Sequence, residues 1–240
     1  MPNPTAAMLV IGDEILSGRT RDANTFHLAG VLTEHGIDLK EVRVVSDDAA
    51  AIVAALRALA STVDYLFTSG GIGPTHDDIT ADCVADAFGQ SIDVRADARK
   101  LLADYYEKSG KELNAARLRM ARIPEKAILI DNPVSIAPGF IVENCYVMAG
   151  VPSVFQAMVQ SVVPLLTGGA PMLSKSLRVE RGEGDIAGPL SELVAAYGDV
   201  SFGSYPFQDN GIYGANIVIR SQDSARLEQA FTALSEKFPE

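Results

Sequence analysis

The stretch that decides the fold is Asp-Tyr-Leu-Phe-Thr-Ser-Gly-Gly-Ile-Gly-Pro-Thr-His-Asp-Asp-Ile-Thr, residues 64–80. Its beginning is apolar and β-prone, so residues 63–67 are predicted to form a short buried strand. Gly70, Gly71 and Gly73 then make a turn with little side-chain bulk, which lets backbone N–H groups approach a ligand closely. A helix is predicted to begin near Asp77 or Asp78, because either aspartate can serve as its N-cap.

A strand, a glycine turn and a helix N-terminus in this order favour a bound anion such as a phosphate. Ser69 and the three glycines of the turn are therefore candidate phosphate-binding residues. The turn lacks the lysine of a P-loop and carries Asp77 and Asp78 instead, and a carboxylate pair suits a divalent cation beside the phosphate. The alternative interpretation is an ordinary tight turn in which Asp78 only caps the helix.

A second acidic pair, Asp13 and Glu14, follows the continuous apolar strand predicted at residues 6–11. In open α/β sheets, ligands bind beyond the carboxyl ends of the strands, where the strand order reverses. If the first and third strands are neighbours there, Asp13, Glu14, Asp77 and Asp78 surround one crevice and can hold a metal ion. The alternative is that Asp13 and Glu14 only bond the amides of their own loop.

Four stretches resemble the MogA/MoaB-type molybdopterin-binding domain, in the version found in the CinA (competence/damage-inducible protein A) family. They are residues 11–18, 69–80, 132–139 and 149–153, and they follow the order and rough spacing of that family. The resemblance covers about the first two thirds of the chain strongly. It implies a three-layer α/β/α fold with a mostly parallel sheet. It also implies further ligand-binding residues within the matching stretches, namely Gly12, Ser17, Thr75, Thr80, Asn132, Pro138, Gly139 and Gly150.

The resemblance also implies catalytic roles for Asp47 and Asp78, with Asp77 beside them, although Asp47 is equally suited to a plain N-cap. CinA-type domains resemble enzymes that split dinucleotide pyrophosphates, notably ADP-ribose, with a divalent metal ion. MogA-type domains bind molybdopterin and adenylylate it instead. We therefore expect a nucleotide pyrophosphatase that uses Mg, Mn or Co, and the alternative is a molybdopterin-binding protein with little turnover.

Two further expectations follow from the resemblance. Full-length CinA carries a following amidohydrolase domain that acts on nicotinamide mononucleotide, and these 240 residues do not contain it, so no deamidase activity is expected. A homo-oligomer, either a dimer or a trimer, is expected by analogy. The sequence departs from the family at Ser135 and Ile136, where glycine or another small residue is common.

Positive charge concentrates in one segment of this acidic chain, at Lys111, Arg117, Arg119 and Arg122, with Lys126 just after. We interpret this segment as a solvated face. The alternative is a basic arm that reaches a neighbouring phosphate, including one across a dimer.

The composition of the chain bears on its partners, its location in the cell and the state of its cysteines. The net charge of −11 argues against a nucleic-acid partner or an anionic membrane surface. No apolar run is long enough for a membrane span and no signal peptide is visible, so a cytoplasmic location is expected. Cys83 and Cys145 are predicted to be packed thiols rather than a disulfide or a metal pair.

Two domains are predicted. Residues 1–167 form the α/β domain, and the turn-rich residues 167–171 form a linker. Residues 174–240 follow a β-α-β-β-α pattern, which suggests a small α+β domain with its helices on one face of an antiparallel sheet.

Overall fold

The structure is a computed structural model that describes residues 2–239. The chain divides into two compact units between Gly169 and Ala170. In the first unit, a six-stranded sheet has the strand order β2-β1-β3-β8-β7-β6. Its parallel strands are β1 (Thr5–Ile11), β2 (Asp38–Val45), β3 (Tyr65–Ser69) and β8 (Cys145–Met148). The antiparallel strands β7 (Gly139–Val142) and β6 (Ile128–Ile130) complete it, so the predicted mostly parallel sheet is confirmed.

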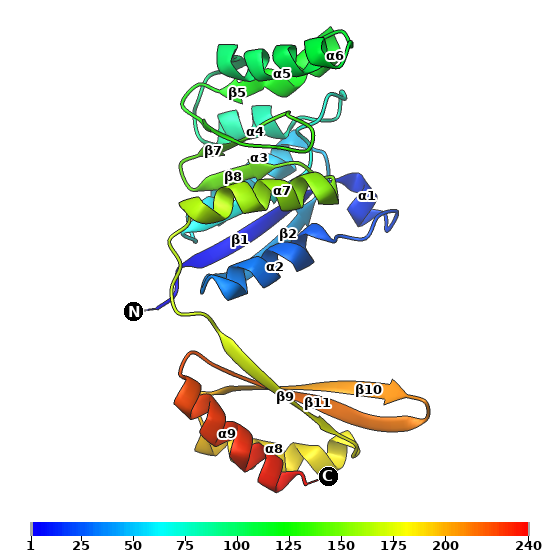
Figure 1. The fold of residues 1–240 in the computed structure, drawn as a ribbon, viewed down its shortest axis with the longest axis vertical. Helices are drawn as coiled ribbons and strands as arrows, with labels where there is room; N and C mark the ends of the chain where they lie inside the picture. The colour runs from blue at the N-terminus through cyan, green and yellow to red at the C-terminus, as the bar shows by residue number, and fades with distance from the viewer. Residues whose placement is uncertain (1, 240) are drawn as a thin grey trace. The chain divides into compact units, whose positions relative to one another are not determined.

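Helices cover both faces of this sheet, as Figure 1 shows. One face packs against α3 (Ala49–Ala60) and α4 (Thr80–Ala87), and the other packs against α2 (Asn24–Glu34) and α7 (Pro152–Val162). Helix α5 (Ala96–Lys108) adds Ala98 and Leu102 to the hydrophobic cluster of the first face. Successive residues of β1 point alternately into the two hydrophobic clusters, which is why this strand reads as one unbroken apolar run. The three-layer α/β/α prediction is confirmed.

Short elements fill the loops of the first unit. They are α1 (Asp13–Leu16), α6 (Ala115–Leu118), η1 (Arg119–Ala121) and η2 (Val163–Leu165). A separate two-stranded antiparallel sheet pairs β4 (Ile92–Val94) with β5 (Arg122–Pro124). This pairing brings the basic segment back beside α4, and three-residue strands are too short to be predicted from a pattern.

The second unit has the predicted order β9 (Leu173–Val179), α8 (Glu183–Ala196), β10 (Ser201–Asp209), β11 (Ile212–Ser221) and α9 (Ser224–Lys237). Its strands form an antiparallel sheet in the order β10-β11-β9. Both helices lie on the same face of this sheet, over a core that includes Ile186, Ile217 and Leu234. The predicted α+β arrangement is confirmed.

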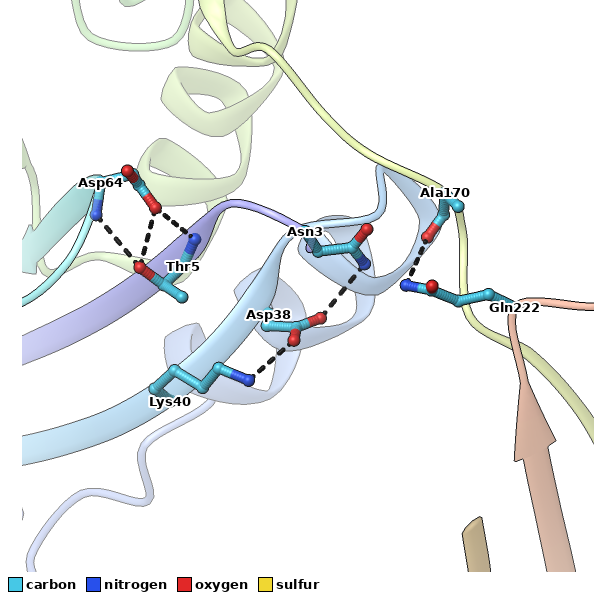
Figure 2. A network of polar contacts seen from close by, with 7 residues as sticks. All are labelled: Asn3, Thr5, Asp38, Lys40, Asp64, Ala170 and Gln222. Carbon is cyan, nitrogen blue, oxygen red and sulfur yellow. Dashed lines mark hydrogen bonds and ion pairs between the residues drawn. The ribbon is translucent and has the colours of Figure 1, made fainter. Parts of the chain in front are cut away.

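A polar clamp fixes the register of β1 against β3 at the amino ends of these strands (Figure 2). The Asp64 carboxylate accepts the Thr5 N–H at 2.7 Å and the Thr5 hydroxyl at 2.8 Å. These hydrogen bonds lower the pKa of Asp64, so the carboxylate stays ionised and keeps accepting both donors. Because the register is fixed here, the loops at the other ends of β1 and β3 come side by side.

Two predictions from the sequence concern the state of the two cysteines and the absence of a membrane span. Cys83 and Cys145 are free and buried, as predicted, and burial raises the pKa of the Cys83 thiol to about 11. Burial raises the pKa of Cys145 as well. Within residues 2–239, no helix combines the length and the apolar character that crossing a bilayer requires.

Candidate functional site

The carboxyl ends of the strands of the first unit surround a cavity of about 380 Å³, here called the main cavity. The chain passes from β1 to β2 on one side and then to β3 on the other side of β1, so the main cavity lies where the strand order reverses. Its volume is in the range of ordinary small-molecule sites. The predicted site residues that line it are Gly12, Glu14, Asp47, Gly70, Gly71, Gly73, Asp77, Asp78, Asn132 and Gly150.

The glycine turn after β3 forms one wall of the main cavity. Gly70 and Gly71 have φ angles of +107° and +69°, a backbone region that residues with a side chain rarely adopt. A Cβ at Gly70 would lie 2.2 Å from the backbone oxygen of Ile11, and one at Gly71 would lie 2.1 Å from Thr80 Oγ1. The turn is therefore packed tightly between β1 and α4, and only glycine fits.

Three successive amides of this turn remain available to a ligand. Within residues 2–239, the N–H groups of Gly71, Ile72 and Gly73 donate to no protein acceptor. The neighbouring amides are in use, since Gly70 N–H donates to the Met148 oxygen and Thr80 N–H donates to the Gly71 oxygen. Free N–H groups in a row at the wall of a cavity are donors that suit phosphate oxygens.

Two hydroxyls that were predicted to contact the ligand lie behind the glycine turn instead. Thr80 is fully buried, and its hydroxyl donates to the Gly70 oxygen at 3.0 Å. Ser69 is also buried, and its Oγ accepts a hydrogen bond from Asn24 Nδ2 at 2.8 Å. The same Asn24 nitrogen donates to the Gly150 oxygen at 2.7 Å. These side chains hold the turn in position rather than lining the main cavity.

Asn24 supports the glycine turn, a role that its position in the sequence does not indicate. Asn24 is the first residue of α2, and the Asp22 carboxylate accepts its backbone N–H and that of Thr25. Asn24 connects α2 to the ends of β3 and β8 through the two bonds described above.

Other predicted ligand residues also lie outside the wall of the main cavity. Ser17 is exposed at the end of α1, and Thr75 is exposed in the turn before α4. Gly139 is buried at the start of β7, where a Cβ would lie 2.5 Å from the Val147 oxygen, so its role is close strand packing. Pro138 lines a second, smaller cavity that adjoins the glycine turn.

Carboxylates dominate the charge of the main cavity. Glu14, Asp47, Asp77 and Asp78 line it, and no lysine or arginine of the described chain does. Asp13 lies just outside, and its backbone N–H donates to Asp47 Oδ2 at 3.0 Å. Desolvation raises the pKa of Asp47 first, and the charges of Asp13, Glu14 and Asp77 raise it further. The acidic residues from the loops after β1, β2 and β3 therefore act on one another, as the predicted acidic crevice requires.

Asp78 serves the loop as well as the main cavity. Its Oδ2 accepts the Thr75 N–H at 2.7 Å and the Thr75 hydroxyl at 2.5 Å, which closes the turn of residues 75–78. The helix α4 begins at Thr80 without a side-chain cap, so the predicted N-cap role of Asp77 or Asp78 is wrong. Asp48, and not Asp47, caps α3 by accepting the Ala51 N–H at 2.9 Å.

The carboxylates do not form a ready-made metal cage. Among residues 2–239, no group of three or more His, Cys, Asp or Glu side chains is arranged to hold a metal ion. Magnesium commonly keeps several waters and uses only one or two carboxylates together with substrate phosphates. The donor set of the main cavity fits that kind of shared coordination and does not fit an all-protein site.

Replacing Asp47 with asparagine is expected to raise the unfolding temperature at neutral pH. The pKa of Asp47 is raised from its ordinary value of 3.8, so the folded protein binds more protons than the unfolded chain between the two pKa values. The free energy of unfolding therefore falls as the pH rises through the pKa that Asp47 has in the folded protein. At pH 7 this destabilisation is fully present. Asparagine removes the charge and keeps an oxygen for the Asp13 N–H.

This prediction is checked by calorimetry of the Asp47→Asn variant across the acidic to neutral pH range. The gain in unfolding temperature should shrink steadily on acidification. Asp48→Asn is the matched control, because asparagine is as good an N-cap as aspartate and should give no such gain. A gain that is absent at pH 7, or that grows in acid, would contradict the raised pKa that desolvation and the neighbouring charges give to Asp47.

The basic segment is only partly the solvated face that we predicted, because its lysines are exposed but its three arginines are half-buried. The Arg117 guanidinium lies 4.5 Å from the centre of the Tyr106 ring. Arg122 pairs with the Asp82 carboxylate at 2.5 Å, and Arg119 Nη2 donates to the Asp78 backbone oxygen at 3.2 Å. The β4–β5 pairing explains the difference, because it folds this segment back onto α4 and the glycine turn.

Comparisons with known proteins identify the family of this fold and site. Residues 7–168 match the family described as "Probable molybdopterin binding domain", and residues 171–240 match "FAD synthase, middle domain". The chain therefore belongs to the molybdopterin-binding-domain family. Within that family it is CinA-like: it is 38% identical over 167 residues to a CinA-like protein of Citrifermentans bemidjiense, covering 68% of this chain and 40% of that protein.

Further relatives extend the similarity over the whole chain. A protein of Pyrococcus furiosus is 32% identical over 244 residues, covering 97% of this chain and 96% of that protein. A probable FAD synthase of Caenorhabditis elegans is 30% identical, covering 97% of this chain and 49% of that enzyme. The chain thus spans about half the length, or less, of the CinA-like protein and the FAD synthase.

A solved structure agrees with the fold of the first unit. The crystal structure of the protein CinA from Thermoplasma acidophilum superimposes with a TM-score of 0.62 at 34% identity. It covers 67% of this chain and 96% of that protein.

Proposed function

We propose that the first unit is a divalent-metal-dependent nucleotide pyrophosphatase that acts on ADP-ribose-like dinucleotides. The observation that carries this proposal is the combination of free amides at Gly71, Ile72 and Gly73 with four carboxylates in one cavity. The amides are donors for phosphate oxygens, but the carboxylates repel a bare diphosphate. A divalent cation such as Mg, Mn or Co would offset the negative charges of both the carboxylates and the diphosphate. Oxygen ligands suit these ions.

In the proposed reaction, water attacks one phosphorus of the diphosphate and the bond from that phosphorus to the bridging oxygen breaks. The products are two monophosphates, one of them AMP when ADP-ribose is the substrate. The cation, when bound, polarises the phosphate and makes the attacking water more acidic. The amides of the glycine turn hold the phosphate oxygens in place throughout.

The carboxylates have separate tasks in this proposal. Asp77 and Asp78 orient the water and bind the cation, and Glu14, with Asp13 just outside, completes the negative field. Asp47 is the best acceptor for the proton that leaves the water, because its pKa is raised toward the working pH. These tasks keep the catalytic and metal-binding assignments expected from the sequence, with Asp13 acting through charge.

Names of relatives support the dinucleotide class of substrate. The Caenorhabditis elegans relative is named as a probable FAD synthase, and FAD is itself a dinucleotide with a diphosphate bridge. The second candidate function is molybdopterin binding with little or no hydrolysis, which the description of the matched family favours. Both ligands carry phosphate, so the amide wall of the main cavity serves either one.

Release of AMP from ADP-ribose separates the two candidates. The purified 240-residue chain is incubated with ADP-ribose and magnesium, manganese or cobalt, and a parallel sample contains EDTA. We expect AMP in at least one metal-containing sample and none with EDTA. Binding of ADP-ribose or molybdopterin without AMP release under any of these conditions would reject the hydrolase and favour the binding protein.

A further inference from the structure

Arg119 has a position that neither the family nor the proposed reaction explains. It lies in η1 and lines a small second cavity, of about 20 Å³, that adjoins the glycine turn. The two cavities share Gly71, Ile72, Gly73 and Asp78 in their walls. Met120 lines both cavities as well, so a group held by Arg119 and a group held in the main cavity are neighbours.

The charge of Arg119 is not balanced within the described part of the chain. Its neighbour Arg122 lines the same small cavity but is already paired with the Asp82 carboxylate. Arg119 forms no ion pair with any carboxylate of residues 2–239, and its one protein hydrogen bond goes from Nη2 to the Asp78 backbone oxygen. Its Nε is buried and has no hydrogen-bond partner among these residues.

A half-buried guanidinium that has no ion pair and an unsatisfied N–H donor is suited to bind an anion. An unsatisfied buried donor costs free energy, and an arginine that still has donors to offer gains most from a planar or tetrahedral oxyanion. The nearby carboxylate of Asp78 is not that anion, because Arg119 donates only to the backbone oxygen of Asp78 among the described residues, and Asp78 Oδ2 accepts both donors of Thr75. The small cavity has room for about one water-sized oxygen atom, which is the size of a single phosphate oxygen.

We propose that Arg119 makes the site select a diphosphate over a monophosphate. One phosphate lies against the free amides in the main cavity, and an oxygen of the adjacent phosphate reaches Arg119 in the small cavity. Two phosphates that share a bridging oxygen need two adjoining subsites, and these two cavities adjoin because they share lining residues of the glycine turn. This inference rests on the proposed function for the identity of the ligand. It assigns to Arg119 the preference for a diphosphate over a monophosphate.

The test measures binding of inorganic pyrophosphate and inorganic phosphate by calorimetry, at one fixed magnesium concentration. The wild-type chain should bind pyrophosphate more tightly than phosphate. Arg119→Gln should lose about 10- to 100-fold in pyrophosphate affinity, the usual effect of removing a charged hydrogen bond, with little change for phosphate. Arg119→Lys keeps the charge but loses the forked geometry, so it should recover part of the pyrophosphate affinity.

Arg117→Gln is the matched control, because Arg117 belongs to the same segment but lies outside both cavities and packs on Tyr106. Its pyrophosphate affinity should equal that of the wild type. Thermal unfolding of each variant identifies any loss of folded protein, and the lysine variant keeps the test decisive if Arg119→Gln unfolds. Equal losses for both anions, or unchanged pyrophosphate affinity in Arg119→Gln, would overturn the inference.

The binding readout is independent of hydrolysis. If the chain releases no AMP from ADP-ribose but its preference for pyrophosphate depends on Arg119, the pyrophosphatase proposal fails and this inference stands. If AMP is released but the chain does not prefer pyrophosphate to phosphate, this inference fails and the proposed function stands.

Discussion

Gly70→Ala is expected to lower the free energy of unfolding by about 3 kcal/mol or more, the largest stability effect of any single methyl group in the site. The new Cβ would lie 2.2 Å from the backbone oxygen of Ile11, which belongs to the central strand β1. That oxygen cannot move aside, because β1 pairs with both β2 and β3. The φ angle of +107° adds backbone strain that a residue with a side chain does not avoid.

Gly89→Ala is the matched control for this experiment. Gly89 also has a positive φ, of +63°, but a Cβ there would meet nothing within 4 Å. Its substitution should therefore cost only the left-handed backbone strain, about 1 kcal/mol. Urea-induced unfolding of both variants measures the difference. Equal costs at the two positions would show that the contact with β1 is not tight, and the glycine turn would lose its status as a rigid wall of the main cavity.

Asp78→Asn is expected to reduce the rate of AMP release from ADP-ribose by at least about 100-fold, the lower part of the range for a positioned acid or base. The change removes the negative charge that binds the cation and orients water. It leaves an amide oxygen that can still accept the Thr75 N–H, so the turn of residues 75–78 should remain closed. The unfolding temperature should accordingly change little.

Two companion variants isolate the role of this charge. Asp78→Ala removes the charge and the bond to Thr75 together, so it should lose both activity and loop stability. Asp86→Asn changes an exposed aspartate of helix α4 whose carboxylate pairs with Arg57, and it should retain full activity. Wild-type rates in Asp78→Asn would remove Asp78 from the proposed reaction.

The parts of the fold that the sequence predicted well are those in which one local pattern has one structural solution. The apolar run of β1 is explained only by burial on both faces of a sheet, and the structure buries alternate residues in two different clusters. The glycine turn was recognisable because Gly70 and Gly71 stand where no other residue fits. Acidic residues after two separate strands of a parallel sheet indicate a shared crevice, because the carboxyl ends of such strands meet at one edge.

The parts that could not be predicted depend on contacts between distant segments. Thr80 and Ser69 belong to a stretch that resembles a ligand-binding motif, but only the fold shows that their hydroxyls bond Gly70 and Asn24 instead of facing the main cavity. The place of Arg119 depends on the pairing of β4 with β5, whose three-residue strands carry no readable periodicity. A charged segment alone therefore could not be distinguished from an ordinary solvated face.

The position of Asp78 illustrates a competition that sequence rules do not resolve. An aspartate just before a helix is a good N-cap, but it can equally accept bonds from the residues that precede it. The structure shows the second arrangement, in which Thr75 donates both its N–H and its hydroxyl to Asp78. This arrangement moves the helix start to Thr80 and leaves Asp77 and Asp78 at the wall of the main cavity.

A crystal structure with a bound substrate analogue would show directly whether the main cavity binds a diphosphate and a metal ion. Crystals are soaked with manganese and an ADP-ribose analogue whose bridging oxygen is replaced by a methylene group, and anomalous scattering locates the manganese. We predict that diphosphate oxygens accept hydrogen bonds from the amides of Gly71, Ile72 and Gly73, with manganese between the diphosphate and the cavity carboxylates. A diphosphate bound elsewhere on the chain, or one that does not touch these amides, would contradict the account.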